Sequence, residues 1–400
     1  MPALTICDGV IEVGAAHDDR KLFDALMPTT FGTTYNSYVV VGDRATALLD
    51  TVDPDKTAVL MQNLRDARIE RIDYMVCLHT EQDHSGSVDA VLQKWPEAVL
   101  VATKKVAEFM ETHLHIPADR FRLIGEGDAL ELGGKTLRFC PTPFAHWPDN
   151  TMAFLEEDRI LFSNDLFGAH YSSEKIFATV GREQIQAARD YFSEIFMPFV
   201  VHVRKYLAKA RAFDPVMVAP SHGPVWWKPE TIFSLYDEWL SDDVRAKVVI
   251  AFVSMHGSTV QLVERLASRL AEAGVSAICR DIASQPENLM LETGHMVADL
   301  VDAAALILAT PTVLGGPHPA AAYAALLATF MKPKTPYFGL IGSYGWGTRI
   351  AESIDTLTAG LKAQRLEPFL VKGLPTSEDL DRMDAYAADL AGKVLAVSRN

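Results

Sequence analysis

The sequence predicts a two-domain α/β protein, with an α/β sandwich over residues 1–245 followed by a doubly wound, parallel, five-stranded sheet over residues 246–400. Three observations support this prediction. The 400 residues are too many for one ordinary hydrophobic core. A composition of 49% hydrophobic and 22% charged residues is typical of globular proteins. The pattern of apolar segments also changes after SLYDEWLSDD, which places the boundary between Asp242 and Arg245.

The first half contains a mixed pattern of strands and helices. Apolar runs predict strands at residues 46–52, 72–79, 98–103, 136–142, 152–163 and 216–222. The run MAFLEEDRILFS is typical of a hairpin that turns at Glu157 and Asp158, which indicates antiparallel pairing. These features favour an α/β sandwich over a barrel.

The second half alternates regularly. It begins with KVVIAFVS (residues 247–254), a continuous apolar run of the kind that is buried in parallel sheets. Further strands are predicted at 275–282, 304–311, 337–344 and 368–373, and helices at 260–274, 319–331, from about 348, and 379–397. Such alternation predicts right-handed βαβ units in one doubly wound sheet.

Charge and hydropathy narrow the possible partners. A formal net charge of -15 and the lack of a dense Lys/Arg run make binding to nucleic acid improbable. The N-terminus MPALTICDGVIEVG does not resemble a secretory signal, and the apolar run from Ala303 is broken by Pro311 and is too short to span a bilayer. We therefore expect a cytoplasmic protein without a membrane partner.

The segment HTEQDHSG (residues 79–86) follows an apolar strand and contains four potential metal ligands within six residues. Further ligands are expected after other strands, in FAHWPDN, LFSNDLFG and APSHGP. The complete set, which we also regard as the catalytic set, is His79, Glu81, Asp83, His84, His146, Asp165 and His222. Four imidazoles and three carboxylates suffice for two metal ions that share one carboxylate.

The order of these ligands resembles the metal-binding sequence of the metallo-β-lactamase superfamily. The hydrolases of that superfamily have a second His where this chain has Glu81. A hard, anionic oxygen donor at this position favours redox-active iron over zinc. Carboxylates also bind zinc, so a zinc-dependent hydrolase remains an alternative.

Three loops of the second half predict a flavin site. The turn SMHGST joins a strand to a helix, where backbone N–H groups and the helix dipole favour a phosphate. Glycines in TPTVLGGPHP and GSYGWGT permit close approach to a planar ring. The predicted FMN-binding residues are Ser254, Met255, His256, Gly257, Ser258, Thr259, Pro311, Thr312, Val313, Leu314, Gly315, Gly316, Ser343, Tyr344, Gly345, Trp346 and Gly347.

Taken together, the H-x-E-x-D-H metal sequence and the three loops resemble the flavodiiron proteins, also called A-type flavoproteins, over essentially the whole chain. The resemblance implies a metallo-β-lactamase-like αββα sandwich followed by a flavodoxin-like domain. It also implies a non-haem di-iron centre in which His79, Glu81 and His146 hold the iron nearer the flavin. Asp83, His84 and His222 would hold the other iron, and Asp165 would bridge the two. Trp147 and GTTYNSY (residues 32–38) also resemble family sequence near the pocket.

The resemblance further implies an activity and its partners. Members of the family reduce dioxygen to water, nitric oxide to nitrous oxide, or both, with electrons that pass through FMN to iron. A head-to-tail homodimer is implied, which brings the FMN of one subunit to the di-iron site of the other. An external donor is needed, usually rubredoxin and in some members a deazaflavin cofactor.

Two other readings of the chain compete with this one. The first is a zinc-dependent metallo-β-lactamase-fold hydrolase fused to a flavodoxin-like electron-transfer module. The second is a flavodoxin-like electron carrier whose N-terminal half is only structural, although its intact metal ligands weigh against that reading. Metal content separates the three classes.

Overall fold

A computed structural model describes residues 2–285 and 288–399 of the chain. It divides into two compact units. The first comprises Met1–Phe23, Thr29–Phe192 and Phe199–Asp237, and the second comprises Asp24–Pro28, Ser193–Pro198 and Glu238–Asn400. Two short segments of the first half therefore group with the second. The simple division into 1–245 and 246–400 stays a prediction, and we describe each unit by itself.

The first unit is built on two sheets. The seven-stranded sheet has the order β1 (Leu4–Cys7), β2 (Val10–Glu12), β7 (Tyr38–Val41), β8 (Thr46–Leu49), β9 (Tyr74–Val76), β10 (Val99–Thr103) and β11 (Phe121–Ile124). The five-stranded sheet has the order β12 (Ala129–Glu131), β13 (Thr136–Pro141), β14 (Thr151–Leu155), β15 (Ile160–Asn164) and β16 (Met217–Pro220). The strands β14 and β15 form the predicted antiparallel hairpin. Short strands lie at β3 (Ala15–His17), β4 (Leu22–Phe23), β5 (Met27–Pro28) and β6 (Thr33–Tyr35).

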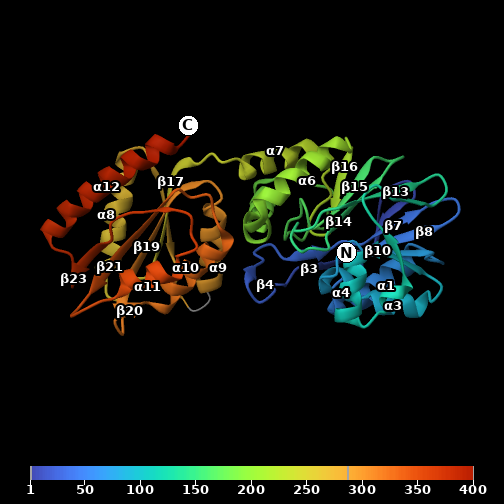
Figure 1. Ribbon diagram of the computed structural model, residues 1–400, viewed down its shortest axis with the longest axis horizontal. Helices are drawn as coiled ribbons and strands as arrows, with labels where there is room; N and C mark the ends of the chain where they lie inside the picture. Colours follow the sequence, from blue (N-terminus) through green and yellow to red (C-terminus); the bar gives the residue numbers. More distant parts are fainter. Residues whose placement is uncertain (1, 286–287, 400) are drawn as a thin grey trace. The chain divides into compact units, whose positions relative to one another are not determined.

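Helices cover both outer faces of this sandwich. Figure 1 shows α1 (Thr57–Asp66), α3 (Val88–Lys94) and α4 (Lys104–Leu114) on one side of the sheets and α6 (Val200–Ala212) on the other. The remaining helices are α2 (Gln82–Ser85), α5 (Arg182–Tyr191) and α7 (Pro229–Leu240). This layering is the predicted αββα sandwich, and it matches the fold expected from the metal-binding sequence.

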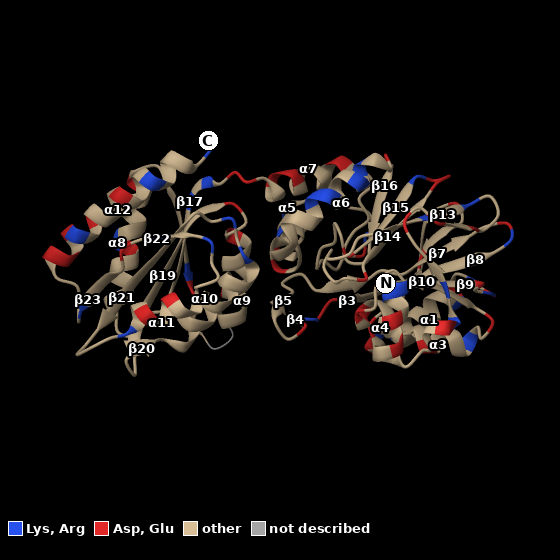
Figure 2. Cartoon of the chain, viewed as in Figure 1, with Lys and Arg blue, Asp and Glu red and all other residues tan. Residues whose placement is uncertain are grey.

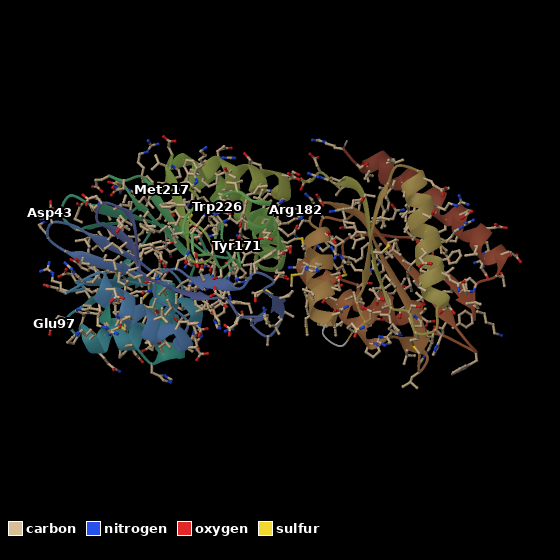
Figure 3. All side chains as sticks on the ribbon, turned by 180° about the vertical axis from the view of Figure 1, so that it is seen from behind. Asp43, Glu97, Tyr171, Arg182, Met217 and Trp226 are labelled. Carbon is tan, nitrogen blue, oxygen red and sulfur yellow. The ribbon has the colours of Figure 1, made fainter. Side chains whose placement is uncertain are left out.

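Apolar side chains fill the space between the two sheets. Members of this core include Val40, Leu49 and Val76 from the first sheet and Phe139, Leu155 and Phe162 from the second. Figure 3 shows the dense side chains of this unit, in which the labelled Trp226 is buried. Removing so much apolar surface from water stabilises the sandwich and fixes the loops at its edge.

The second unit is a doubly wound parallel sheet. Its strand order is β18 (Ser276–Asp281), β17 (Arg245–Phe252), β19 (Ala303–Val313), β21 (Tyr337–Tyr344) and β22 (Gln364–Arg365). The strand β23 (Phe369–Lys372) also pairs with β21, at a later part of that strand than β22 does. Two short strands therefore fill the fifth position, and the predicted flavodoxin-like, five-stranded order is confirmed. The hairpin from β19 to β20 (Gly316–Pro317), the strand β22 and the helix α9 (Asn288–Asp299) were not predicted.

Helices cover both faces of this sheet (Figure 1). The helices α8 (Ser258–Glu272) and α12 (Ser377–Val397) contact each other, while α10 (Pro319–Met331) contacts both α9 and α11 (Ile350–Leu357). The helix α9 also lies against the segment that contains Pro28, where a Cβ added to Gly294 would come within 2.5 Å of the Pro28 ring. A glycine is therefore required at this helix contact.

The helix α12 illustrates how local sequence sets an element of the second unit. It begins with a capping box in which Thr376 and Asp379 exchange side-chain and backbone hydrogen bonds. Its buried face contains Met383, Ala387 and Leu390, and Figure 2 shows acidic and basic residues along its length. Within the described residues, every helix is too short or too polar to cross a membrane.

Candidate functional site

The seven predicted ligands come together at one edge of the first unit. His79 follows β9, Glu81 precedes the short helix α2, and Asp83 and His84 lie within α2. The other three come from the loops after β13, β15 and β16, all in the second sheet. Three overlapping groups have ligand atoms close enough to hold a metal ion: His79, Glu81 and His146; His79, His84 and Asp165; and Asp83, His84 and His222.

The carboxylate of Asp165 lies between two sets of ligands. Its Oδ2 atom is 3.6 Å from Nε2 of both His79 and His146. Its Oδ1 atom is 2.9 Å from Nε2 of His84 and 3.5 Å from Nε2 of His222. One oxygen therefore faces each set, as a carboxylate shared by two metal ions requires.

Short contacts also hold each set together. Glu81 Oε2 is 3.2 Å from Nε2 of both His79 and His146. On the other side, Asp83 Oδ2 is 3.1 Å from Nε2 of His222. His79, Glu81 and His146 therefore lie together, as do Asp83, His84 and His222, and Nε2 of His84 is 3.4 Å from Asp83. The division of these ligands between two metal ions stays a prediction.

Buried polar atoms of this cluster suit a cation. Both carboxylate oxygens of Asp83 and both ring nitrogens of His84 are buried, and apart from close approaches to other members of the cluster they have no hydrogen-bond partner. Leaving such groups unpaired costs roughly 1–3 kcal/mol each, and more when they are charged. A metal ion would satisfy them, so the donor set fits a pair of metal ions.

Neighbouring charges shift the pKa values of ligands in this cluster. Burial alone would lower the pKa of His79, but the charge and hydrogen bond of Asp149 raise it well above its usual value. Burial of Glu81 opposes ionisation, yet the hydrogen bonds with His146 and His79 hold its pKa well below its usual range. Metal binding must displace protons from such ligands, so it is linked to pH.

The same competition sets the other half of the cluster. Burial would lower the pKa of His84, but the carboxylates of Asp83 and Asp165 raise it to about 10. Burial would raise the pKa of Asp165, and the charge of His84 instead holds it well below its usual range. For His79, Glu81, His84 and Asp165, attraction between imidazoles and carboxylates therefore dominates over burial.

A second layer of residues orients the ligands. Asp149 contacts Nδ1 of His79 at 3.0 Å and accepts hydrogen bonds from the backbone and hydroxyl of Thr80. The carbonyl of Thr34 lies 2.7 Å from Nδ1 of His222. Asn150 donates to Asp165 at 3.0 Å. Such partners fix the ring orientation and strengthen the ligands.

No role was predicted for Thr80, Asp149 or Asn150. Asp149 and Asn150 stand beside a predicted ligand in FAHWPDN, and that proximity was the available signal. Two buried residues of this region have left-handed backbones, Asp50 with φ 54° and Asn164 with φ 53°. Strain of this kind is common where loops must aim functional side chains.

Two sequence features that resemble the flavodiiron family also lie at the centre. The Trp147 ring is 5.1 Å from the His79 ring in an edge-on contact. From GTTYNSY, Thr34 supports His222, and the Tyr35 ring lies 6.1 Å from the His222 ring. Both features therefore form walls of the metal cluster.

In the second unit, the three predicted loops meet at the carboxyl ends of the parallel strands. They line a cleft of about 160 Å³. The predicted residues in its lining are Met255, His256, Ser258, Thr259, Pro311, Thr312, Ser343, Tyr344 and Gly345. Gly373, which follows β23, also lines the cleft and was not predicted.

Eight other predicted flavin residues do not line this cleft. They are Ser254, Gly257, Val313, Leu314, Gly315, Gly316, Trp346 and Gly347. Gly257 begins α8 with φ 89°, a conformation that glycine adopts without strain. The hydroxyl of Ser254 accepts from the backbone of Val260 in the first turn of α8. Leu314 and Trp346 are 99% and 95% exposed.

The cleft offers the features that a phosphate and a flat ring require. Gly257 makes no side-chain cap, which leaves N–H groups of the first turn of α8 for an anion. Hydroxyls of Thr259 and Ser343 face each other at 3.4 Å. The exposed side chains of Trp346 and Leu314 supply apolar surface beside the cleft. These residues fit FMN.

A choice of site by cavity volume alone would favour a groove elsewhere in the first unit. A groove of about 680 Å³ lies in the first unit and is lined by Trp227, Leu4 and residues 174–180. Its lining includes none of the seven ligands, and its charged residues are Glu174, Lys175 and Lys228. We therefore place the chemistry at the metal cluster, which has a converging donor set.

Comparison with known proteins gives consistent results. The family described as ODP family beta lactamase matches residues 33–223. The coenzyme F420H2 oxidase of Methanothermobacter marburgensis is 30% identical over 409 residues, which cover 98% of each chain. The nitric oxide reductase of Moorella thermoacetica is 29% identical over 404 residues, again 98% of each chain. The solved structure of rubredoxin oxygen:oxidoreductase from Desulfovibrio gigas superposes with a TM-score of 0.92 at 25% identity and covers 98% of this chain and 99% of that one.

Proposed function

Because the chain belongs to the flavodiiron (type A flavoprotein) family, we propose that it reduces dioxygen to water, nitric oxide to nitrous oxide, or both. The observation that carries the proposal is the position of Asp165, with one carboxylate oxygen facing each of two ligand sets. The names of relatives support both substrates, since they include an F420H2 oxidase and a nitric oxide reductase.

We propose that the cluster holds two iron ions, with the ligands divided as their geometry divides them. His79, Glu81 and His146 would hold one ion, Asp83, His84 and His222 the other, and Asp165 would bridge them. When bound, such a centre supplies electrons to a small gaseous substrate through the ferrous and ferric states of iron. The three carboxylates, Glu81 among them, favour iron over zinc by donor chemistry.

The chain's own residues prepare the site for this chemistry. Asp149 and the Thr34 carbonyl fix the orientations of the His79 and His222 rings. Asp83, His84, Asp165 and His222 are buried, which excludes bulk water from that side of the centre. His146 and Glu81 are partly exposed, with side chains 15% and 14% accessible, so a small molecule would enter on their side.

In the second unit, we propose FMN as the bound flavin. The first turn of α8, with Ser258 and Thr259, would bind the phosphate, and Tyr344 and Gly345 would line the ribityl chain and ring. The cleft of about 160 Å³ is smaller than the 300–1,000 Å³ of typical ligand pockets. The isoalloxazine would therefore extend over the exposed Trp346 and Leu314.

Metal content and turnover test this function directly. The purified protein should contain iron and FMN, and it should consume dioxygen or nitric oxide when a chemical reductant is supplied. Zinc without iron, together with thioesterase or lactamase activity, would instead establish the hydrolase alternative. Flavin without any bound metal would establish the electron-carrier alternative.

We also propose a head-to-tail homodimer in which the flavin of one subunit serves the metal centre of its partner. Two-fold symmetry gives two equivalent contacts and is the commonest symmetry of soluble oligomers. A His79→Ala chain that lacks iron, mixed with a chain that lacks only FMN, should regain activity in verified heterodimers. No recovery, or full activity in a dilute monomer, would show that transfer runs within one chain.

The electron donor is external in this proposal. A relative named for F420H2 oxidation supports a deazaflavin donor, and a structural relative named for rubredoxin supports a small iron protein. We propose a rubredoxin-like donor first. Flavin reduction by each purified donor in stopped-flow experiments decides between them. A cytoplasmic location remains a prediction from the sequence.

A further inference from the structure

His170 is a buried imidazole beside the metal cluster that the proposed metal sets do not use. It is 5% exposed and follows β15 by six residues. Its ring lies 5.2 Å from the His222 ring, 4.8 Å from the Tyr191 ring and 4.5 Å from the Phe23 ring. It belongs to none of the groups of described residues that could hold a metal ion.

One nitrogen of His170 is satisfied and the other is not. Nδ1 is 2.9 Å from the hydroxyl of Thr33, whereas Nε2 is buried without a hydrogen-bond partner. Buried polar groups in folded proteins are nearly always paired, and an unpaired one costs roughly 1–3 kcal/mol. The neighbouring unpaired atoms of Asp83 and His84 are explained by a metal ion, but the nitrogen of His170 is not.

The hydroxyl of Thr33 decides which ring nitrogen carries the hydrogen. Its other contact is the carbonyl of Thr34 at 3.3 Å, which already faces Nδ1 of His222 at 2.7 Å. The contact with His170 is the shorter of the two, and donation along it leaves the carbonyl of Thr34 to His222. A ring that accepts at Nδ1 carries its own hydrogen on Nε2.

We propose that His170 is a hydrogen-bond donor reserved for a small ligand that enters past His146 and Glu81 and reaches the buried Asp83 and His222 side of the metal centre. Its Nε2–H would donate to an oxygen or nitrogen acceptor atom of that ligand, and Thr33 would keep the ring in the donating tautomer. This role deepens the proposed function, because it identifies a substrate-contacting residue outside the ligand sets. A donor placed before the ligand arrives stabilises developing negative charge without reorganisation.

Binding of azide tests the proposal separately from turnover. Cobalt-loaded wild type, His170→Phe and His170→Gln are titrated with azide and followed by the visible absorbance of the metal. The phenyl ring keeps the packing against His222 and removes the donor, whereas the Gln amide restores one. We expect the Phe variant to bind azide about tenfold more weakly, as loss of a hydrogen bond to a charged group implies. The Gln variant should stay within about threefold of wild type.

Controls separate a donor from a structural residue. The partly buried His202 packs against Phe144 in the same unit, and His202→Phe should leave azide affinity unchanged. Metal content should equal that of wild type in all variants. Equal azide affinity in wild type and His170→Phe would overturn the proposal, and so would loss of metal from that variant. A Gln variant as weak as the Phe variant would also overturn it, since ring shape would then explain the effect.

The turnover assay shows whether the proposed function or the role of His170 has failed. With iron-loaded protein, His170→Phe should lower the turnover number for dioxygen or nitric oxide by about tenfold or more. If the iron-loaded wild type reduces neither gas, the proposed function fails while the azide titration still tests His170. Normal wild-type turnover with unchanged azide binding in the Phe variant would reject the role of His170 alone.

Discussion

The metal cluster and the flavin cleft are built by opposite means. In the cluster, side chains carry the chemistry, and nearly all of them are buried and paired with opposite charges. In the cleft, backbone turns and glycines shape the surface, and the large apolar side chains beside it are exposed. We infer that the metal-binding site of the first unit is preformed, whereas the cleft of the second unit is completed only when the flavin binds.

Loss of the carboxylate of Asp165, which faces both ligand sets, should have the largest effect on iron content and turnover. In Asp165→Ala, both ligand sets lose an oxygen and the imidazoles of His84 and His79 lose a counter-charge. We expect iron content to fall at both positions and turnover to fall by at least about 100-fold. Metal analysis and gas consumption check this, and Asp19→Asn, at a 92% exposed side chain, is the control. Full iron in the Ala variant would contradict the bridging role.

A change in Asp149, which contacts His79 but belongs to neither ligand set, should have a smaller effect on iron binding. Asp149→Asn keeps the shape of the side chain but removes the charge beside Nδ1 of His79. We expect iron affinity to fall by about 10–100-fold while FMN content stays at the wild-type level. Chelator competition measures the affinity. An unchanged iron affinity would show that the His79 ring needs no orienting partner.

Loss of FMN binding in the cleft should leave iron binding in the first unit unchanged. Ser258→Glu places a negative charge in the first turn of α8, where the FMN phosphate is proposed to bind. We expect the variant to lose FMN, seen as loss of the yellow absorbance, and to retain its iron. Ser276→Glu, at an exposed position of β18, is the matched control. A Ser258→Glu variant with native flavin absorbance would place the phosphate elsewhere.

These sites differ in how far the sequence could predict them. The seven candidate ligands could be proposed from the sequence because each is a metal-binding residue type at or shortly after the end of a strand, and these segments of the two sheets meet at one edge of the unit. The contacts of Asp149, Thr33 and His170 could not be predicted in the same way, because they join residues far apart in the sequence. Thr33 and His170, for example, are 137 residues apart.

The fold shows a similar division. Long apolar runs such as β17, β19 and β21 were predicted, because strands buried on both faces are continuously apolar. The two-residue strands β20 and β22 leave no such pattern, and their pairing depends on the neighbouring strand. The same reason explains why Gly373 was missed in the cleft, since its role comes from the strand that it follows.

The smallest expected effect is on the stability of the second unit. Thr376→Ala removes the capping box of α12, in which the Thr376 hydroxyl and Asp379 bond to each other's backbone. We expect a loss of about 1 kcal/mol in the unfolding free energy of this unit and no change in iron content. Urea unfolding of both proteins, followed by circular dichroism, measures the difference. If the variant lost iron as well as stability, the two units would not be independent of each other.

The fate of dioxygen tests the central claim that electrons pass from the flavin to the metal cluster. Chemically reduced wild type and His79→Ala are mixed with dioxygen under identical conditions, and hydrogen peroxide is measured as the flavin reoxidises. The wild type should consume dioxygen without accumulating peroxide, because the cluster completes the reduction to water. The variant, which lacks a ligand shared by two of the metal groups, should reoxidise its flavin with release of peroxide. Equal peroxide release from both proteins would contradict the account.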